Sequence, residues 1–295
     1  MRVSRKYAVG VIGAGRVGGV LGAAFARAGH RVVAAAGVSA ASTARVRELL
    51  PGAALLPADQ VAAVADLVLL AVPDDALAGL VAGLVETGSI RSGQLIVHTS
   101  GAHGLAVLAP AVARGALPLA MHPAMTFTGT AADLERLAAG ISYGVTTPHR
   151  RTAALLVRDL GGTVEWVAEE NRALYHAALA HGANHLVTLV NEAMDRLRDA
   201  GVADPARVLA PLLGAALDNT LRLGDAALTG PVSRGDAGTV AKHLVAIDRV
   251  APESTGVYRA LARRTADRAI ASGRLKTIDA APLLDVLATD RERVA

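Results

Sequence analysis

The chain has 295 residues, which is enough for two domains of ordinary size. Hydrophobic residues make up 52% of it and aromatic residues only 2%, so Ala, Val and Leu must build the core, and the absence of cysteine excludes disulfides, thiolate nucleophiles and Cys-ligated zinc. The formal net charge of +4 comes from dispersed basic residues with no aromatic residues interleaved, which argues against a nucleic-acid partner.

No apolar run reaches the roughly 20 residues that a membrane-spanning helix needs. The basic segment Met1–Lys6 is followed closely by a glycine-rich loop rather than by the apolar stretch of a signal peptide. We therefore expect a cytoplasmic protein with no membrane partner.

Short apolar runs alternate with amphipathic segments in the first part of the chain. Such alternation predicts βαβ units and a mostly parallel sheet. The predicted strands are residues 7–12, 31–36, 66–72, 94–97, 117–121, 141–145 and 163–167. The continuous apolar run of residues 66–72 is typical of a strand covered on both faces.

From residue 169 onward only helical periodicity is present. The predicted helices are residues 170–200, 205–223, 236–251, 252–272 and 281–287. The sequence therefore predicts a dinucleotide-binding domain over residues 1–168, followed by an all-helical domain over residues 169–295. The helical half carries more Ala, Leu and Val than one small helical layer can bury alone, so we expect it to form a homodimer.

A glycine-rich loop follows the first predicted strand and opens a helix. Its six residues are Gly13, Ala14, Gly15, Arg16, Val17 and Gly18. The first glycine permits a tight turn, the second lets the backbone approach a pyrophosphate, and the third allows close packing of helix on strand. This context predicts a doubly wound α/β fold of the Rossmann type, in which the loop binds a dinucleotide at a helix N-terminus.

The end of the second strand indicates which dinucleotide is bound. NAD-binding chains place an acid there for the ribose hydroxyls, but residues 34–38 contain none. The hydroxyls of Ser39, Ser42 and Thr43 and the cation of Arg45 follow, and these groups suit a 2′-phosphate. We therefore predict NADP(H) as the cofactor, although Ser39 to Thr43 could simply cap the next helix.

The ends of three further strands are expected to face the ligand, because ligands bind at the carboxyl ends of the strands in this fold. Val72 and Pro73 are expected along the dinucleotide. Ser100 and His122 are expected near the nicotinamide, where a hydroxyl can orient a substrate and a histidine can give a proton to a carbonyl oxygen. A buried structural role is the alternative for His122, and it is equally open for His98, which ends the same strand that precedes Ser100.

The first helix of the second half carries unusual polar residues. His176 lies in its apolar stripe and Asn184 at the edge of that stripe, so both could line a cleft or form a structural network. His181 and His185 have a metal-capable spacing but no third ligand in view, and we expect no metal site.

Several segments together resemble a known bacterial family. They read VIGAGRVG, LLAVPDD, HTSGAHG, MHPAMTF, ALYHAALAHGANHLVTL and LTGPVSRGDAGTVAKHL, in this order over nearly the whole chain. They are similar to the Rossmann-like and DUF2520 domain-containing proteins, which resemble in plan 6-phosphogluconate dehydrogenase, ketopantoate reductase and pyrroline-5-carboxylate reductase. The resemblance implies NADP(H) binding, a helical second domain that often dimerises, and a small-molecule substrate.

One departure from these relatives affects the expected chemistry. Ketopantoate reductases carry Lys-x-x-x-Asn on the first long helix of the second domain; Asn184 matches the Asn, but Ala180 stands at the Lys position. The predicted catalytic set is therefore His122, Asn184, Ser100 and His176. The expected activity is NADPH-dependent reduction of a small carbonyl compound, favoured as a 2-oxo acid such as ketopantoate. Reduction of a cyclic imine, or dinucleotide sensing or scaffolding without turnover, are the alternatives.

Overall fold

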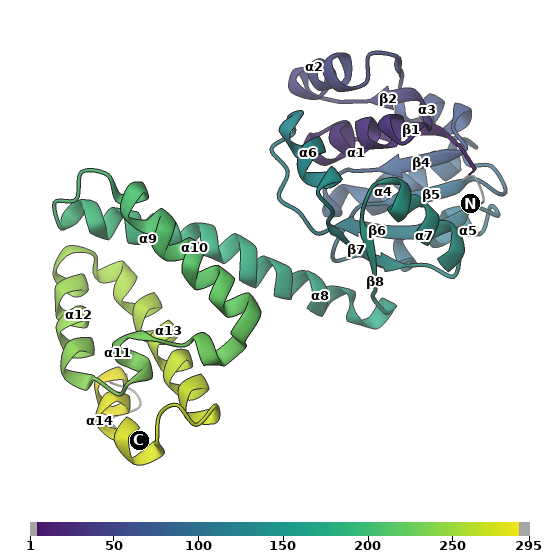
Figure 1. The fold of residues 1–295 in the computed structure, drawn as a ribbon. Coiled ribbons are helices and arrows are strands. Elements are labelled where there is room, and N and C mark those ends of the chain that lie inside the picture. The colour runs from purple at the N-terminus through teal and green to yellow at the C-terminus, as the bar shows by residue number, and fades with distance from the viewer. Residues whose placement is uncertain (1–4, 289–295) are drawn as a thin grey trace. The chain divides into compact units, whose positions relative to one another are not determined.

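The computed structural model describes residues 5–288, and they form two compact units that divide between Ala183 and Asn184. The first unit is an eight-stranded sheet with helices on both faces, and the second contains helices only (Figure 1). The expected α/β Rossmann-type fold followed by a helical region is confirmed. The basic segment expected at Met1–Lys6 lies mostly outside the described residues. None of the helices described is long and apolar enough to span a bilayer.

The sheet has the strand order β3-β2-β1-β4-β5-β6-β7-β8. Its strands are β1 (Ala8–Ile12), β2 (Arg31–Ala36), β3 (Ala54–Leu55), β4 (Leu67–Leu70), β5 (Leu95–His98), β6 (Leu117–Pro123), β7 (Ser142–Thr146) and β8 (Thr163–Trp166). Neighbours pair in parallel except β6 with β7, which pair antiparallel. All seven predicted strands are present. The two-residue β3 was missed because it is too short to show a pattern.

Two apolar cores lie on the two faces of this sheet. The helices and 3₁₀ turns of the unit are α1 (Arg16–Arg27), α2 (Ala40–Leu49), α3 (Ala58–Val64), α4 (Asp74–Glu86), η1 (Ala106–Leu108), α5 (Ala109–Val112), α6 (Ala132–Ala138), α7 (Arg150–Asp159), η2 (Glu169–Asn171) and α8 (Arg172–Leu179). One core takes side chains from α1, α2, α6 and α7, and the other takes them from α3, α4 and α5. Continuous burial of β4 explains its unbroken apolar sequence.

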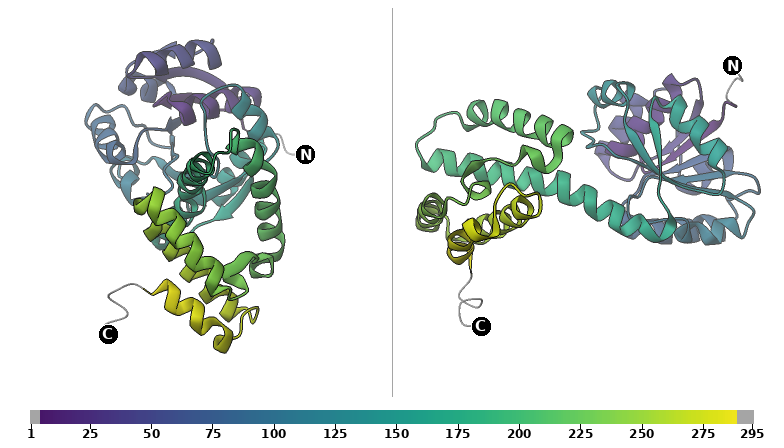
Figure 2. Two further views of the ribbon diagram at one scale, coloured as in Figure 1. Left: turned by 90° about the vertical axis from the view of Figure 1, so that its left-hand side faces the viewer. Right: turned by 60° about the horizontal axis from the view of Figure 1, so that its bottom comes forward.

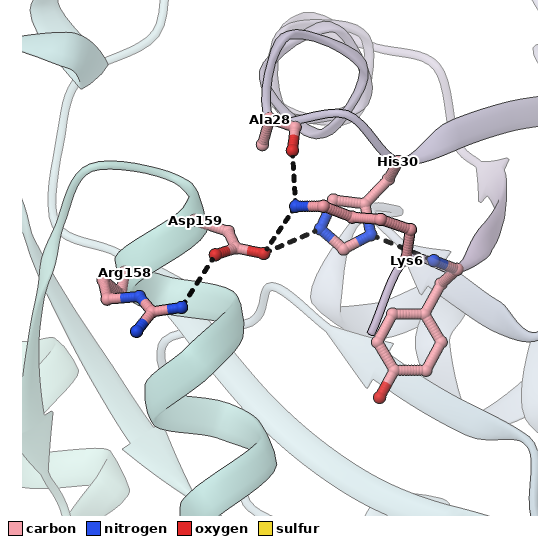
Figure 3. A network of polar contacts seen from close by, with 6 residues as sticks. Lys6, Ala28, His30, Arg158 and Asp159 are labelled. Carbon is pink, nitrogen blue, oxygen red and sulfur yellow. Dashed lines mark hydrogen bonds and ion pairs between the residues drawn. The ribbon is translucent and has the colours of Figure 1, made fainter. Parts of the chain in front are cut away.

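A polar network near the amino ends of β1 and β2 connects the start of the chain to the end of α7 (Figure 3). One carboxylate oxygen of Asp159 accepts from Lys6 Nζ at 3.1 Å and lies 3.3 Å from Nε2 of His30. The Tyr7 amide donates to Nδ1 of His30 at 3.2 Å, so Nε2 is the nitrogen that carries hydrogen and donates to Asp159. Burial, followed by the charge of Lys6, lowers the pKa of His30, which keeps this ring neutral.

The second unit consists of helices α9 to α14, coloured green to yellow in Figures 1 and 2. They are α9 (His185–Asp199), α10 (Pro205–Leu223), the 3₁₀ turn η4 (Gly224–Ala227), α11 (Gly230–Ser233), α12 (Ala237–Val250), α13 (Pro252–Ala271) and α14 (Thr277–Leu287). Its core comes mainly from α12, α13 and α14. Asp236 caps α12 by accepting from the Thr239 amide at 3.0 Å.

The predicted single helix over residues 170–200 is wrong in one respect. The segment Ala180–Asn184 forms a π-helical turn between α8 and α9. A π turn bonds i to i+5, so the helical-wheel position expected for Asn184 from a regular 3.6-residue period does not apply. The two units also divide in this turn, because α8 is anchored to the sheet unit through Arg172.

Candidate functional site

The glycine loop at the end of β1 has the geometry of a phosphate cradle. Gly13 has a φ of +89° and a Cβ there would lie 2.5 Å from the carbonyl oxygen of Ala71, so only glycine fits. A Cβ on Gly18 would overlap the Gly13 carbonyl oxygen, so the absence of a side chain there allows the helix to pack close to the strand. Gly15 precedes α1, and a Cβ added to Gly15 would meet no atom nearer than 3.9 Å. There is thus open space where a pyrophosphate would approach the backbone.

The first turn of α1 supplies the donors for such a ligand. Helix amides in the first turn have no intrahelical acceptor, and the dipole of the helix favours an anion there. The amides of Gly13 and Ala14 are instead used by the Ala36 carbonyl, at 3.1 and 3.0 Å, which ties the loop to the end of β2. Ala14 is fully buried, Val17 is half-buried and the side chain of Arg16 is exposed.

Val72 and Pro73 lie beside this cradle. A methyl of Val72 would be 2.9 Å from a Cβ on Gly13, and Pro73 occupies the position before the first residue of α4. Asp74 is the first residue of α4, and Pro73 holds the cap position. The apolar wall expected from Val72 is thus next to the glycine loop.

Ser39 and Ser42 form a capping box at the start of α2. Oγ of Ser39 accepts from the Ser42 amide at 3.1 Å, and Oγ of Ser42 accepts from the Ser39 amide at 3.0 Å. The sequence left two roles open for Ser39, binding a 2′-phosphate or capping the next helix. The structure shows the capping role. The cation of Arg45 lies further along α2, where its Nε donates to the Gly129 carbonyl at 3.0 Å.

A cluster of polar rings forms at the carboxyl end of β6. Nδ1 of His122 lies 3.0 Å from the phenol oxygen of Tyr175 on α8, and the His122 and His176 ring centroids are 6.0 Å apart. A Cβ on Gly101 would lie 2.5 Å from Cδ2 of His176, so the glycine makes room for that ring. Of the four predicted catalytic residues, the structure brings together His122, His176 and the loop that begins with Ser100. Asn184 begins the second unit.

Arg172 holds the loop that carries Ser100 and Gly101. Its side chain is buried, and its guanidinium donates to the His103 carbonyl at 3.0 Å, to the Gly144 carbonyl at 3.0 Å and to the Ser100 carbonyl. These acceptors compensate the cost of burying a cation. The Ser100 hydroxyl accepts from the His103 amide at 3.0 Å, so it stabilises the loop from within.

The electrostatic environment keeps His122 and His98 neutral. Burial, followed by the charge of Arg172 and the neighbouring His176, lowers the pKa of His122 to about 4. Burial likewise lowers the pKa of His98 to about 4, and Nε2 of His98 lies 2.8 Å from the Gly104 carbonyl oxygen. His122 is therefore uncharged near pH 7 and holds no imidazolium proton to give.

Burial also raises the pKa of the Tyr175 phenol, so Tyr175 stays protonated at neutral pH. Tyr175 and Arg172 were missed in the sequence, although both belong to the segment that resembles the family. Their partners are 53 and 72 residues away along the chain, and no local pattern reveals such contacts. A glycine at position 144, where a Cβ would lie 2.5 Å from Cζ of Tyr175, was the available signal.

Among residues 5–288, no group of three or more His, Cys, Asp or Glu side chains is arranged to hold a metal ion. His181 lies in the π turn and His185 begins α9.

Comparison with known proteins agrees with this architecture. Residues 1–123 match the model of the Rossmann-like domain, and residues 141–265 match the domain of unknown function DUF2520. No curated protein matches the chain.

Solved structures share the fold across nearly the whole chain. One is described as a "putative NADP oxidoreductase" from Bacteroides fragilis, with 23% identity and a TM-score of 0.73 over 89% of this chain and 98% of that one. An imine reductase from Pseudomonas sp. has 20% identity and a TM-score of 0.63 over 96% and 100%. A pyrroline carboxylate reductase from Plasmodium falciparum, solved with NADP bound, has 11% identity and a TM-score of 0.59 over 90% and 100%.

Proposed function

We propose that this chain, which belongs to the proteins with a Rossmann-like domain followed by a DUF2520 domain, is an NADP(H)-dependent reductase of a small C=N or C=O compound. The observation that carries the proposal is the joint placement of two sites on one sheet edge. The glycine cradle follows β1, and the cluster around His122 and Tyr175 lies at the end of β6 in the same unit. Three inter-strand spacings separate β1 from β6, roughly 14 Å in total.

The residues of the cradle fit a dinucleotide. Gly13 and Gly18 permit the tight turn and the close packing of α1, and the open space beside Gly15 leaves room for a pyrophosphate. The first turn of α1 supplies amide donors for it. The acid-free end of β2 and the cations of Arg16 and Arg45 favour the 2′-phosphate form. When bound, NADPH would supply a hydride to the substrate.

Tyr175 is the group that we assign as proton donor. Nδ1 of His122 can carry a hydrogen and donate it to the phenol oxygen, which leaves the phenol hydrogen free for a substrate nitrogen or oxygen. As Tyr175 gives its proton, it takes one from Nδ1, and His122 regains a proton from solvent at Nε2. The neutral His122 acts as a relay, and His176 packs beside it.

An imine substrate suits this cluster better than a 2-oxo acid. A substrate carboxylate needs a cation, and Arg172 already donates to three carbonyl groups of the protein. The similar solved structures include an imine reductase. The 2-oxo acid, with ketopantoate as its example, remains the second candidate because Asn184 matches the residue of the ketopantoate reductases.

A panel of cyclic imines and 2-oxo acids, followed by NADPH absorbance, tests the proposal. Turnover with a cyclic imine is expected, and turnover with 2-oxo acids alone would reverse the preference. NADPH binding with no turnover across both classes would favour a sensor or scaffold.

We also propose that the second unit forms a homodimer. No residue of α9 is buried, and Pro205 is the only buried residue of α10. Leu189, Leu212 and Leu221 are exposed by 42%, 63% and 79%, and a groove of about 440 Å³ opens between α9, α12 and α13. A second copy would cover this apolar surface. Light scattering should give twice the chain mass at micromolar concentration, and a monomer would contradict the proposal.

A further inference from the structure

We infer that the loop between β6 and α6 controls the choice between NADPH and NADH, and that Asp133 acts in this as a positioning residue. The inference rests on the proposed function, since it concerns the same cofactor site. Its elements are a buried carboxylate, a glycine carbonyl, and the guanidinium group of Arg45.

The loop is held from inside by Asp133, whose side chain is fully buried. Its carboxylate accepts from the Gly129 amide at 2.7 Å, from the Thr128 amide at 2.8 Å and from the Thr128 hydroxyl at 3.0 Å. Burial acts to raise the pKa of Asp133, but the bonds from Gly129 and Thr128 and the charge of Arg136 outweigh it and lower the pKa. The carboxylate therefore stays ionised, and it fixes the backbone of residues 128–129.

Gly129 brings this fixed backbone against two cations. Its φ is +83°, and a Cβ there would lie 2.9 Å from both Cγ of Arg16 and Nε of Arg45. Its carbonyl accepts from Nε of Arg45 at 3.0 Å. On the other side, a Cβ on Gly19 would lie 2.8 Å from Cδ of Arg45. The Arg45 side chain is thus confined between α1 and the loop, one turn after the glycine cradle.

The bond to Gly129 orients the rest of the guanidinium group. With Nε used, the two Nη groups remain, and a guanidinium can bind a phosphate through such a pair of donors. Within residues 5–288, neither Arg16 nor Arg45 forms an ion pair with an acid. Both cations are therefore available to an external anion.

Two of the three hydroxyls near the end of β2 are already used within the protein. The hydroxyls of Ser39 and Ser42 serve the capping box of α2, and residues 34–38 carry no charge. Thr43 offers only a neutral hydroxyl, so the charge that recognises a 2′-phosphate must come from Arg45 and Arg16. Because Asp133 sets the position of Gly129, it sets the orientation of Arg45.

The test measures the dissociation constants of NADPH and NADH by fluorescence titration of the full-length protein and its variants. Arg45→Ala should lower the preference for NADPH about 10-fold or more, since a charge-assisted pair is lost. Asp133→Asn should lower it about 3- to 10-fold, with little change for NADH. The ratio of the two constants is the readout, because a purely structural loss would weaken both cofactors alike.

Asp159→Asn is the matched control. Asp159 is 9% exposed, lies in the same unit and holds Lys6 and His30 instead of the loop (Figure 3). This variant should keep the wild-type ratio even if its melting temperature falls. Thr128→Val, which removes a single hydroxyl donor to Asp133, should shift the ratio in the same direction by a smaller factor, and it decides the matter if Asp133→Asn does not fold.

The failure of this inference differs from the failure of the proposed function. A wild-type protein that binds neither cofactor would overturn both. A wild-type preference for NADPH that survives Arg45→Ala, or that survives in folded Asp133→Asn, would overturn the inference alone.

Discussion

Two regions lie at the carboxyl ends of the strands, the glycine loop after β1 and the cluster at the end of β6, and they consist of different groups. The end at β1 is made of backbone, since Gly13, Gly15 and Gly18 contribute no side chain. The end at β6 is made of side chains: His122 is within hydrogen-bond distance of Tyr175, and the His176 ring lies beside the His122 ring. The first end can hold a ligand but offers no proton, whereas the second can move a proton but presents no anion cradle. Affinity for the cofactor and rate of turnover should therefore depend on separate residues.

The largest effect is expected at Tyr175. Tyr175→Phe removes the phenol hydrogen and keeps the ring, so turnover should fall by about 10²–10⁴-fold, the usual contribution of a positioned acid. NADPH affinity should stay within about twofold of wild type, because the cradle is untouched. Steady-state kinetics and cofactor titration check the two parts. Unchanged turnover would remove Tyr175 from the mechanism.

His122→Ala should also lower turnover, by about 10²-fold, since Tyr175 then loses its relay. The double variant with Tyr175→Phe should be no slower than Tyr175→Phe alone, because residues that act as one unit are not additive. Turnover numbers of the three variants decide this. Losses that multiply in the double variant would show that the two residues act independently.

The opposite pattern is expected at the glycine loop. Gly18→Ala places a methyl against the Gly13 carbonyl, and such overpacking costs about 1–3 kcal/mol. Where this cost falls on the conformation that binds the cofactor, it corresponds to roughly 5- to 150-fold in NADPH affinity. Turnover at saturating NADPH should change far less. Gly79→Ala on α4 is the control, since a Cβ there meets nothing within 4 Å. Equal affinities for wild type and Gly18→Ala would contradict the cradle.

The last expected effect concerns stability, which should depend on pH. His98 and His122 have pKa values of about 4 in the folded state, below the ordinary 6.5. Below pH about 6.5 these two histidines bind protons in the unfolded chain but not in the folded one, so the free energy of unfolding should fall as the pH drops toward 4. Each shift corresponds to at most roughly 3 kcal/mol. Urea unfolding at pH 7, 5.5 and 4.5 measures this, and His122→Gln should flatten the curve. A pH-independent midpoint would contradict the burial of these rings.

Much of the fold could be predicted because its signals are local. Apolar runs revealed all strands but β3, and the spacing of Gly13, Gly15 and Gly18 identified the loop. The site around β6 was predicted only in part. His122 and His176 were chosen for their positions, but Tyr175 and Arg172 act through contacts with residues far away along the chain. The π turn at Ala180–Asn184 was also missed, because one altered hydrogen-bond register leaves no compositional trace.

The most direct test of the account is a fluorescence titration of the full-length protein with NADPH and with NADH. The cradle predicts saturable binding of one dinucleotide per chain, and the acid-free end of β2 together with Arg16 and Arg45 predicts tighter binding of NADPH. A protein that shows no saturable signal with either cofactor, or that binds NADH more tightly, would contradict it.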